Sequence, residues 1–226
     1  MGLPSLVLVH GGQHAGDCWE PTIERLGCLD PDLKVLAVDL PGRRGKSGDL
    51  ITACLHGWVD SVVSDIDAAG LDDLVIVAHS MAGLIVPGVV AKLGSARVRE
   101  MILAAAYVPP DGSALVDTMP GPLGWYARHV SLRKAQKGEP SGSRFYPESP
   151  SIVLESVDRS AMPHEVPRTW ILTTRDRALS VKLQRASIQA IGGVQQVISV
   201  ETCHNLMISE PEKMAQILVE RCRLYG

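Results

Sequence analysis

The chain has 226 residues, 46% of them hydrophobic, and a formal net charge of −3 from 25 acidic and 22 basic side chains. This length and composition predict one globular domain with a sizeable core, and they exclude disordered and fibrous classes. The charges are interspersed and leave no basic footprint, so no nucleic-acid partner is expected.

The predicted elements alternate between strands and helices along the chain. Aliphatic and β-branched runs predict buried parallel strands, and between them a stripe such as Leu55, Trp58, Val62 and Ile66 predicts an amphipathic helix. The alternation predicts an α/β fold with a doubly wound, mostly parallel sheet, helices on both faces, and a site at the carboxyl ends of the strands. In chain order we expect strand 5–10, helix 17–26, strand 34–38, helix 55–66, strand 74–79, helix 81–93, strand 101–107, strand 168–173, helix 180–191, strand 195–200 and helix 211–222.

One stretch interrupts this rhythm. Residues 109–167 are rich in Pro, Gly and Ser and delay the next strand well beyond a normal crossover. We interpret them as an inserted cap on a core made of residues 1–108 and 168–226. Helical pieces are expected at 123–137 and 152–157, with an irregular stretch at 140–150.

A candidate nucleophile follows the third predicted strand. Ala78-His79-Ser80-Met81-Ala82 lies between a buried strand and a helix, the order that a nucleophile elbow requires. The common pattern G-x-S-x-G has glycines where this chain has alanines, but the turn requires only that these residues be small. The alternative is that Ser80 merely caps the following helix.

The first predicted strand ends in a turn that can supply an oxyanion hole. Glycines in His10-Gly11-Gly12-Gln13-His14 can present backbone N–H groups, and we expect those of Gly12 and Met81 to form the pair. An ordinary strand-to-helix loop is the alternative. His10, Gly11 and His14 would then line the substrate pocket.

The general base and its orienting acid are sought after Ser80, because the chain order in this kind of hydrolase is Ser, acid, His. His204 follows the last predicted strand, whereas His129 and His164 fall inside the predicted cap. Asp176 follows the buried strand 168–173 and is favoured as the acid, with Asp111 as its competitor.

Arg43, Arg44 and Lys46 form the densest basic stretch of the chain. They lie in a Gly-rich loop that we interpret as solvated, because a P-loop would require a glycine at the position of Leu40.

Taken together, these motifs resemble the α/β-hydrolase superfamily, in particular its compact branch of plant methyl esterases and hydroxynitrile lyases. The resemblance covers nearly the whole chain and is weak only in the predicted cap. It implies a six-stranded core in which Ser80, Asp176 and His204 occupy the triad positions. The lyases have a threonine and a lysine where this chain has Gly11 and Asn205, so the resemblance favours ester hydrolysis over cyanide release.

The predicted function is that of a serine hydrolase acting on a small carboxylic ester through an acyl-enzyme. The alternatives are acyl transfer, cyclisation or carbon–carbon cleavage in the same pocket, and a ligand-binding receptor with little turnover. Trp125 and Tyr126, with Met81, Met119 and Met162, are expected to supply an apolar pocket. No cofactor or metal is expected, since no cluster has ligand spacing.

The expected location is the cytoplasm. Five cysteines without a Cys-x-x-Cys pair suggest reduced thiols, and the N-terminal residues lack a signal-type pattern. No apolar run is long enough to cross a bilayer, so no membrane partner is expected. The oligomeric state stays open, a homodimer included.

Overall fold

The centre of the molecule is a six-stranded parallel sheet with the strand order β2-β1-β3-β4-β5-β6. The computed structural model describes residues 2–119, 121–140 and 146–226. The predicted six-stranded α/β architecture is confirmed. The strands are β1 (Ser5–Val9), β2 (Val35–Val38), β3 (Leu74–His79), β4 (Val98–Ala104), β5 (Arg168–Thr173) and β6 (Gln196–Val200).

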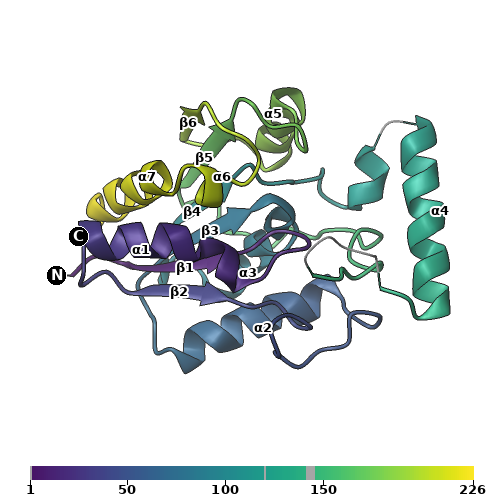
Figure 1. Ribbon diagram of the computed structural model, residues 1–226, viewed down its shortest axis with the longest axis horizontal. Helices are drawn as coiled ribbons and strands as arrows, with labels where there is room; N and C mark the ends of the chain where they lie inside the picture. Colours follow the sequence, from purple (N-terminus) through teal and green to yellow (C-terminus); the bar gives the residue numbers. More distant parts are fainter. Residues whose placement is uncertain (1, 120, 141–145) are drawn as a thin grey trace.

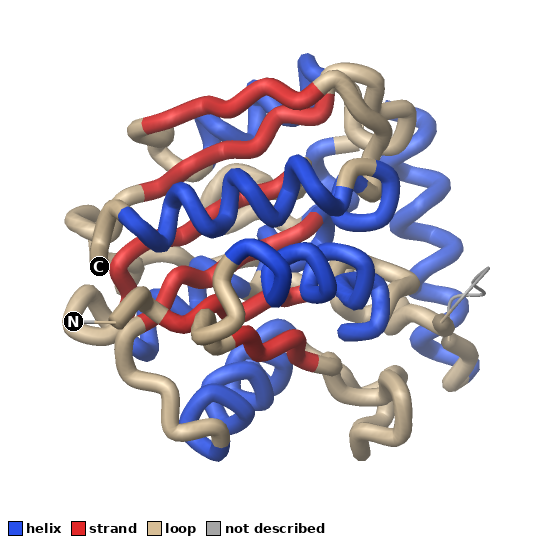
Figure 2. The backbone as a smooth tube through the Cα atoms, turned by 60° about the vertical axis from the view of Figure 1, so that its left-hand side comes forward, coloured by secondary structure: helices blue, strands red, loops and turns tan. Residues whose placement is uncertain are grey.

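Helices cover both faces of the sheet (Figures 1 and 2). Alternate residues of each inner strand face opposite sides, so Val7 and Ile76 enter one apolar cluster while Leu6 and Val75 enter the other. The first cluster packs against α2 (Leu55–Ala68), α3 (Val86–Leu93) and α5 (Val181–Ala190). The second packs against the 3-10 turn η1 (Gly16–Trp19), α1 (Glu20–Leu29), α6 (Leu206–Ser209) and α7 (Pro211–Arg223).

The order of the strands places the candidate site. The chain passes from β1 outwards to β2 and then returns to the other side of β1 as β3, which makes β1 and β3 neighbours. Val9 pairs with Ala78 at the carboxyl ends of these two strands. The turn after β1 and the elbow after β3 therefore open at the same point, the switch point where open α/β sheets bind ligands.

Strand β4 differs from its prediction at both ends. It begins at Val98, three residues early, because the charged residue Glu100 is buried by partners far along the chain, Thr169 and Arg221. It ends at Ala104 because Ala105 takes a positive φ of 43°.

Residues 109–167, which precede β5, will be called the cap segment, and its described residues lie across the carboxyl ends of the strands. It contains the 3-10 turn η3 (Leu115–Thr118) and helix α4 (Gly121–Lys137), which stands at the opposite end of the molecule from both termini (Figure 1). The helix predicted at 152–157 is wrong. Backbone bonds there run across to the beginning of the cap segment instead, from Gly112 to Val157 and from Val157 to Ser113.

These cross-bonds join the beginning and the end of the cap segment into a short paired stem, residues 109–114 with 156–159. The Arg159 guanidinium donates to the carbonyl of Pro109 and its backbone N–H to Asp111. Residues 141–145, part of the stretch expected to be irregular, lie outside the described residues. Among the helices of the described part of the chain, none has the length and apolar character needed to cross a membrane.

Candidate active site

Ser80 occupies a strained turn at the end of β3. Its φ is +52°, a left-handed conformation that a side-chain-bearing residue adopts only where the surroundings enforce it. Ala78 and Ala82 are buried on either side, and a Cβ on Gly83 would overlap with the carbonyl oxygen of Tyr107. The turn therefore requires small residues, and the chain beyond it, η2 (Ser80–Leu84), begins as a 3-10 helix.

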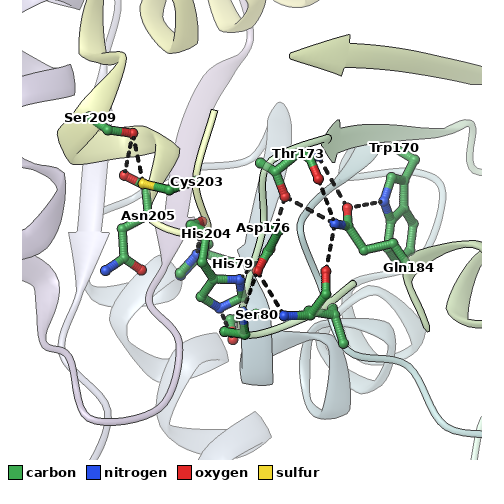
Figure 3. Close-up of polar contacts among 12 residues, drawn as sticks. His79, Ser80, Trp170, Thr173, Asp176, Gln184, Cys203, His204, Asn205 and Ser209 are labelled. Atoms are coloured by element: carbon green, nitrogen blue, oxygen red, sulfur yellow. Dashed lines mark hydrogen bonds and ion pairs between the residues drawn. The ribbon is translucent and has the colours of Figure 1, made fainter. Parts of the chain in front are cut away.

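The structure brings Ser80, His204 and Asp176 together from three strand ends (Figure 3). His204 Nε2 lies 2.8 Å from Ser80 Oγ, and His204 Nδ1 lies 2.6 Å from Asp176 Oδ2. A carboxylate can only accept here, so Nδ1 carries the proton and Nε2 is left to accept the proton of Ser80. This is the arrangement that makes a serine hydroxyl nucleophilic.

The carboxylate of Asp176 is fully buried and receives four hydrogen bonds. Oδ1 accepts from the backbone N–H groups of Ala178 and Leu179, and Oδ2 accepts from the Thr173 hydroxyl as well as from His204. Burial by itself would raise the pKa of Asp176, but the hydrogen bonds, led by the one from His204, outweigh it and hold the pKa below its ordinary value. The group is therefore a charged acceptor for His204 at neutral pH.

A buried glutamine on α5 holds the loop that carries Asp176. Gln184 Nε2 donates to Thr173 Oγ1 at 3.0 Å and to the carbonyls of Thr173 and Leu179 (Figure 3), and its Oε1 accepts from the Thr173 N–H and the Trp170 indole. The reverse amide orientation would set oxygen against two carbonyl oxygens. The Thr173 hydroxyl proton is thus directed to Asp176. Gln184 was not among the predicted site residues, because its one local signal is an amide on the sheet-facing side of a helix.

Asp111, the competitor for the acid role, lies elsewhere. It accepts from the Arg159 backbone N–H in the stem of the cap segment and has no contact with His204. The sequence left both aspartates as candidates for the acid, and the structure places Asp176, not Asp111, beside His204.

The turn after β1 and the elbow after β3 each leave one backbone donor free. Neither the Gly12 N–H nor the Met81 N–H has a hydrogen-bond partner among the described residues, and both residues line the same cavity as Ser80. A Cβ on Gly11 would lie 2.7 Å from the Ser80 Cβ, so glycine is needed there for the close approach of turn and elbow.

His10 and His14 support this turn and do not line the cavity. His10 is buried, donates through Nδ1 to the carbonyl of Gly11 and accepts from the Leu40 N–H, and burial lowers its pKa from 6.5 to about 4. His14 donates to the carbonyl of Gly12. None of His10, Gly11 and His14 lines the cavity as predicted. The two histidine rings instead hold backbone groups of the turn, and Gly11 allows the turn to approach Ser80 closely.

His79 anchors the loop of His204. Its Nε2 donates to the carbonyl of His204 at 3.0 Å, and the two rings lie 4.9 Å apart (Figure 3). Burial, with a smaller contribution from His204, holds the pKa of His79 well below its ordinary value, so the ring is neutral.

A cavity of about 520 Å³ opens over Ser80 and His204, between the strand ends and the cap segment. Trp125 and Tyr126 do not reach it: they lie on the outer side of α4 with 69% and 61% of their surface exposed, and Trp125 stacks on His129. Met162 is buried in the core instead. The apolar wall consists of Met81, Leu115, Met119, Val153, Leu179 and Leu183.

The basic loop after β2 is only partly solvated. Arg43 is fully buried, against the expectation from sequence, because it forms an ion pair of 2.7 Å with Glu148 of the cap segment and lies over the Trp58 ring. Glu148 also accepts from the Gln13 N–H at 3.0 Å and lines the cavity. This pair joins residues 105 apart in sequence, a distance over which local patterns carry no signal.

Within the described ranges, no group of three or more His, Cys, Asp or Glu side chains has an arrangement that could hold a metal ion. The polar groups at the site instead form a chain of hydrogen bonds from Asp176 through His204 to Ser80.

Known proteins share this fold. The sequence profile of the alpha/beta hydrolase family matches residues 6–217, and the chain belongs to that family. It is 30% identical over 122 residues to the carbendazim hydrolyzing esterase of a Nocardioides species, a match that covers 54% of this chain and about half (49%) of that protein.

Two further relatives cover nearly the whole chain. The pyrethroid hydrolase of Sphingobium wenxiniae is 22% identical over 248 residues, covering 97% of this chain and 88% of that protein. In structure, the chain is similar to an extracellular alpha/beta-hydrolase from a Paenibacillus species, with a TM-score of 0.79, 20% identity and coverage of 96% and 98% of the two chains. Family and relatives together support a hydrolase.

Proposed function

We propose that this protein is a serine esterase that hydrolyses small carboxylic esters. The observation that carries the proposal is the chain of hydrogen bonds from Ser80 Oγ through His204 to Asp176, at 2.8 and 2.6 Å, beside two unpartnered backbone N–H groups. The names of the two curated relatives, an esterase and a hydrolase, support an ester as substrate.

In the first half of the reaction, Ser80 Oγ attacks the acyl carbon while His204 Nε2 takes its proton. The oxyanion that forms is stabilised by the Gly12 and Met81 N–H groups, each worth about a hundredfold to a thousandfold in rate. The tetrahedral intermediate collapses, the alkoxide leaves as the alcohol with the proton from His204, and the acyl group remains on Ser80.

In the second half, His204 deprotonates a water molecule that attacks the acyl-Ser80 carbonyl. The same two N–H groups stabilise the second intermediate, and its collapse releases the acid and returns the proton to Ser80. Asp176 stays ionised throughout, because its four hydrogen bonds favour the charged form.

The test is turnover of 4-nitrophenyl acetate and butyrate, with mass-spectrometric detection of fluorophosphonate labelling. We expect the wild type to turn over and to be labelled at Ser80, and Ser80→Ala to do neither. Ser131→Ala is the matched control, since Ser131 lines the same cavity and should leave turnover intact. A wild type that is neither labelled nor active would contradict the proposal and favour a ligand-binding protein.

A further inference from the structure

The wall of the cavity carries one charged side chain that the proposed mechanism does not use. Of the described residues lining the cavity, Glu148 is the sole carboxylate, and none is a lysine or arginine. Its side chain is 8% exposed, and one of its oxygens, Oε2, would lie 3.3 Å from a Cβ placed on Gly12. A carboxylate thus stands beside the turn expected to hold the oxyanion.

Arg43 balances the charge of Glu148, but only from the side that faces away from the cavity. Oε1 accepts from Arg43 at 2.7 Å and from the Ser149 N–H, whereas Oε2 accepts from the Gln13 N–H. Arg43 is completely buried and does not line the cavity. A bound molecule therefore meets the carboxylate first, with the guanidinium behind it.

This asymmetry has a consequence for substrates. Two like charges about 6 Å apart, at an effective dielectric constant of about 20, repel strongly enough to change a rate by about a hundredfold. Arg43 offsets part of this repulsion, which leaves an effect of about tenfold. Oε2 also keeps capacity to accept another hydrogen bond, since a carboxylate oxygen has two lone pairs and one is used.

We propose that Glu148 is a specificity-determining residue that makes the site select uncharged esters, including those with an N–H or O–H donor, and disfavour esters that carry an anionic group. The inference rests on the proposed esterase function and names its substrate class. Arg43 sets the strength of the selection by partly neutralising the carboxylate.

The test compares two esters of nearly the same shape. The 4-nitrophenyl esters of adipic and adipamic acid differ only in ending in a carboxylate or a carboxamide, so apolar contacts cancel in the ratio of their kcat/KM values. We expect the wild type to prefer the carboxamide by about tenfold. A wild-type ratio of one would overturn the proposal without any variant.

Four proteins then separate charge selection from a merely structural ion pair. Glu148→Gln leaves Arg43 without its counter-ion, so the preference should disappear or invert. Arg43→Met breaks the same pair but leaves the carboxylate, so the preference should increase. The double variant should lie between them. A structural role would lower both rates and leave the ratio equal in all four, which would refute the proposal.

Circular dichroism and urea midpoints establish which variants fold. Either single variant that folds differs by one charge from the wild type and decides the question, whereas the double variant has the wild-type net charge at this pair and serves as the control. If neither single variant folds, the wild-type ratio decides alone. If the wild type hydrolyses neither of these two esters, and no 4-nitrophenyl acetate or butyrate either, the proposed function fails. The selection is then measured separately, as the ratio of binding constants for the two matching 4-nitroanilides by isothermal titration calorimetry. If this ratio of binding constants is the same in the wild type and in Glu148→Gln, the inference is overturned as well.

Discussion

The strand-end loops and the cap segment enclose the same cavity but are held in different ways. Asp176 receives four hydrogen bonds, three from residues within three positions of it in the sequence and the fourth from His204. Gln184, on the following helix α5, donates to Thr173 in this network. The cap segment instead reaches the site through Glu148, whose partner Arg43 is 105 residues away.

The two regions therefore differ in their proposed roles: the strand-end loops carry the reacting groups, and the cap segment contributes to the wall that a substrate would touch. The groups proposed to react are fixed by the edge of a parallel sheet, whose geometry follows from strand order. The wall that a substrate would touch depends on contacts between distant parts of the chain. Changes in the strand-end loops should therefore act on rate and stability, and changes on the outside of the cap segment should act on neither.

Among changes that leave the nucleophile Ser80 in place, the largest effect is expected from Asp176→Asn. The amide oxygen would stay with the two backbone N–H groups at Oδ1, which places the NH2 group against His204 Nδ1. His204 would then carry its proton on Nε2 and could not accept that of Ser80. We expect kcat to fall by about a thousandfold to ten-thousandfold, measured with 4-nitrophenyl butyrate.

The matched control is Asp111→Asn in the stem, which should change kcat less than twofold. An Asp176→Asn enzyme that keeps a tenth of its activity would mean that the acid is elsewhere.

Acidification should destabilise the strand-end loops through His10. Its pKa is 6.5 when unfolded and about 4 when folded, so the unfolded chain binds the proton first as pH falls. The stability that this group contributes is complete above pH 6.5 and is lost between pH 6.5 and 4, by roughly 3 kcal/mol.

Urea midpoints at pH 7.5 and 4.5 measure this loss. The difference should shrink in His10→Gln and stay unchanged in His129→Gln, whose histidine is exposed on α4. An equal pH dependence in wild type and His10→Gln would show that other groups govern the acid response.

Gln184→Leu should weaken the support of Asp176 without touching the reacting atoms. Thr173 would lose the donor that directs its hydroxyl, and we expect kcat to fall by about tenfold with KM nearly constant, together with a loss of about 1–3 kcal/mol for the buried groups left unpaired. Gln189→Leu, at an exposed position of the same helix, is the control. A change in KM alone would contradict a positioning role.

The smallest effect is expected on the outer face of α4. Trp125→Ala and Tyr126→Ala remove large side chains that are mostly exposed and line no part of the cavity. Rates with 4-nitrophenyl butyrate should stay within about twofold and urea midpoints nearly unchanged, as for surface substitutions in general. A tenfold rise in KM for either variant would place these rings in the substrate's path.

The same division explains what the sequence could and could not predict. Ser80 and His204 could be predicted as neighbours because an elbow and a loop after the last strand have local signatures. The strands could be predicted because they are short aliphatic and β-branched runs, even though the edge strand β6 is mostly exposed. The start of β4 was not predicted because Glu100 is charged, and its burial in a strand depends on Arg221, which is far away in the sequence. The burial of Arg43 had no local signature at all.

The stem of the cap segment gives the fold a modular character. Since residues 109–114 and 156–159 pair with each other, the two chain segments that lead into and out of the rest of the cap segment lie side by side, as at a site where loops are exchanged during evolution. A different cap could be grafted there while the reacting residues stay in place, provided that it offers Arg43 a new counter-ion. New substrate ranges could thus arise from a single recombination within one reading frame.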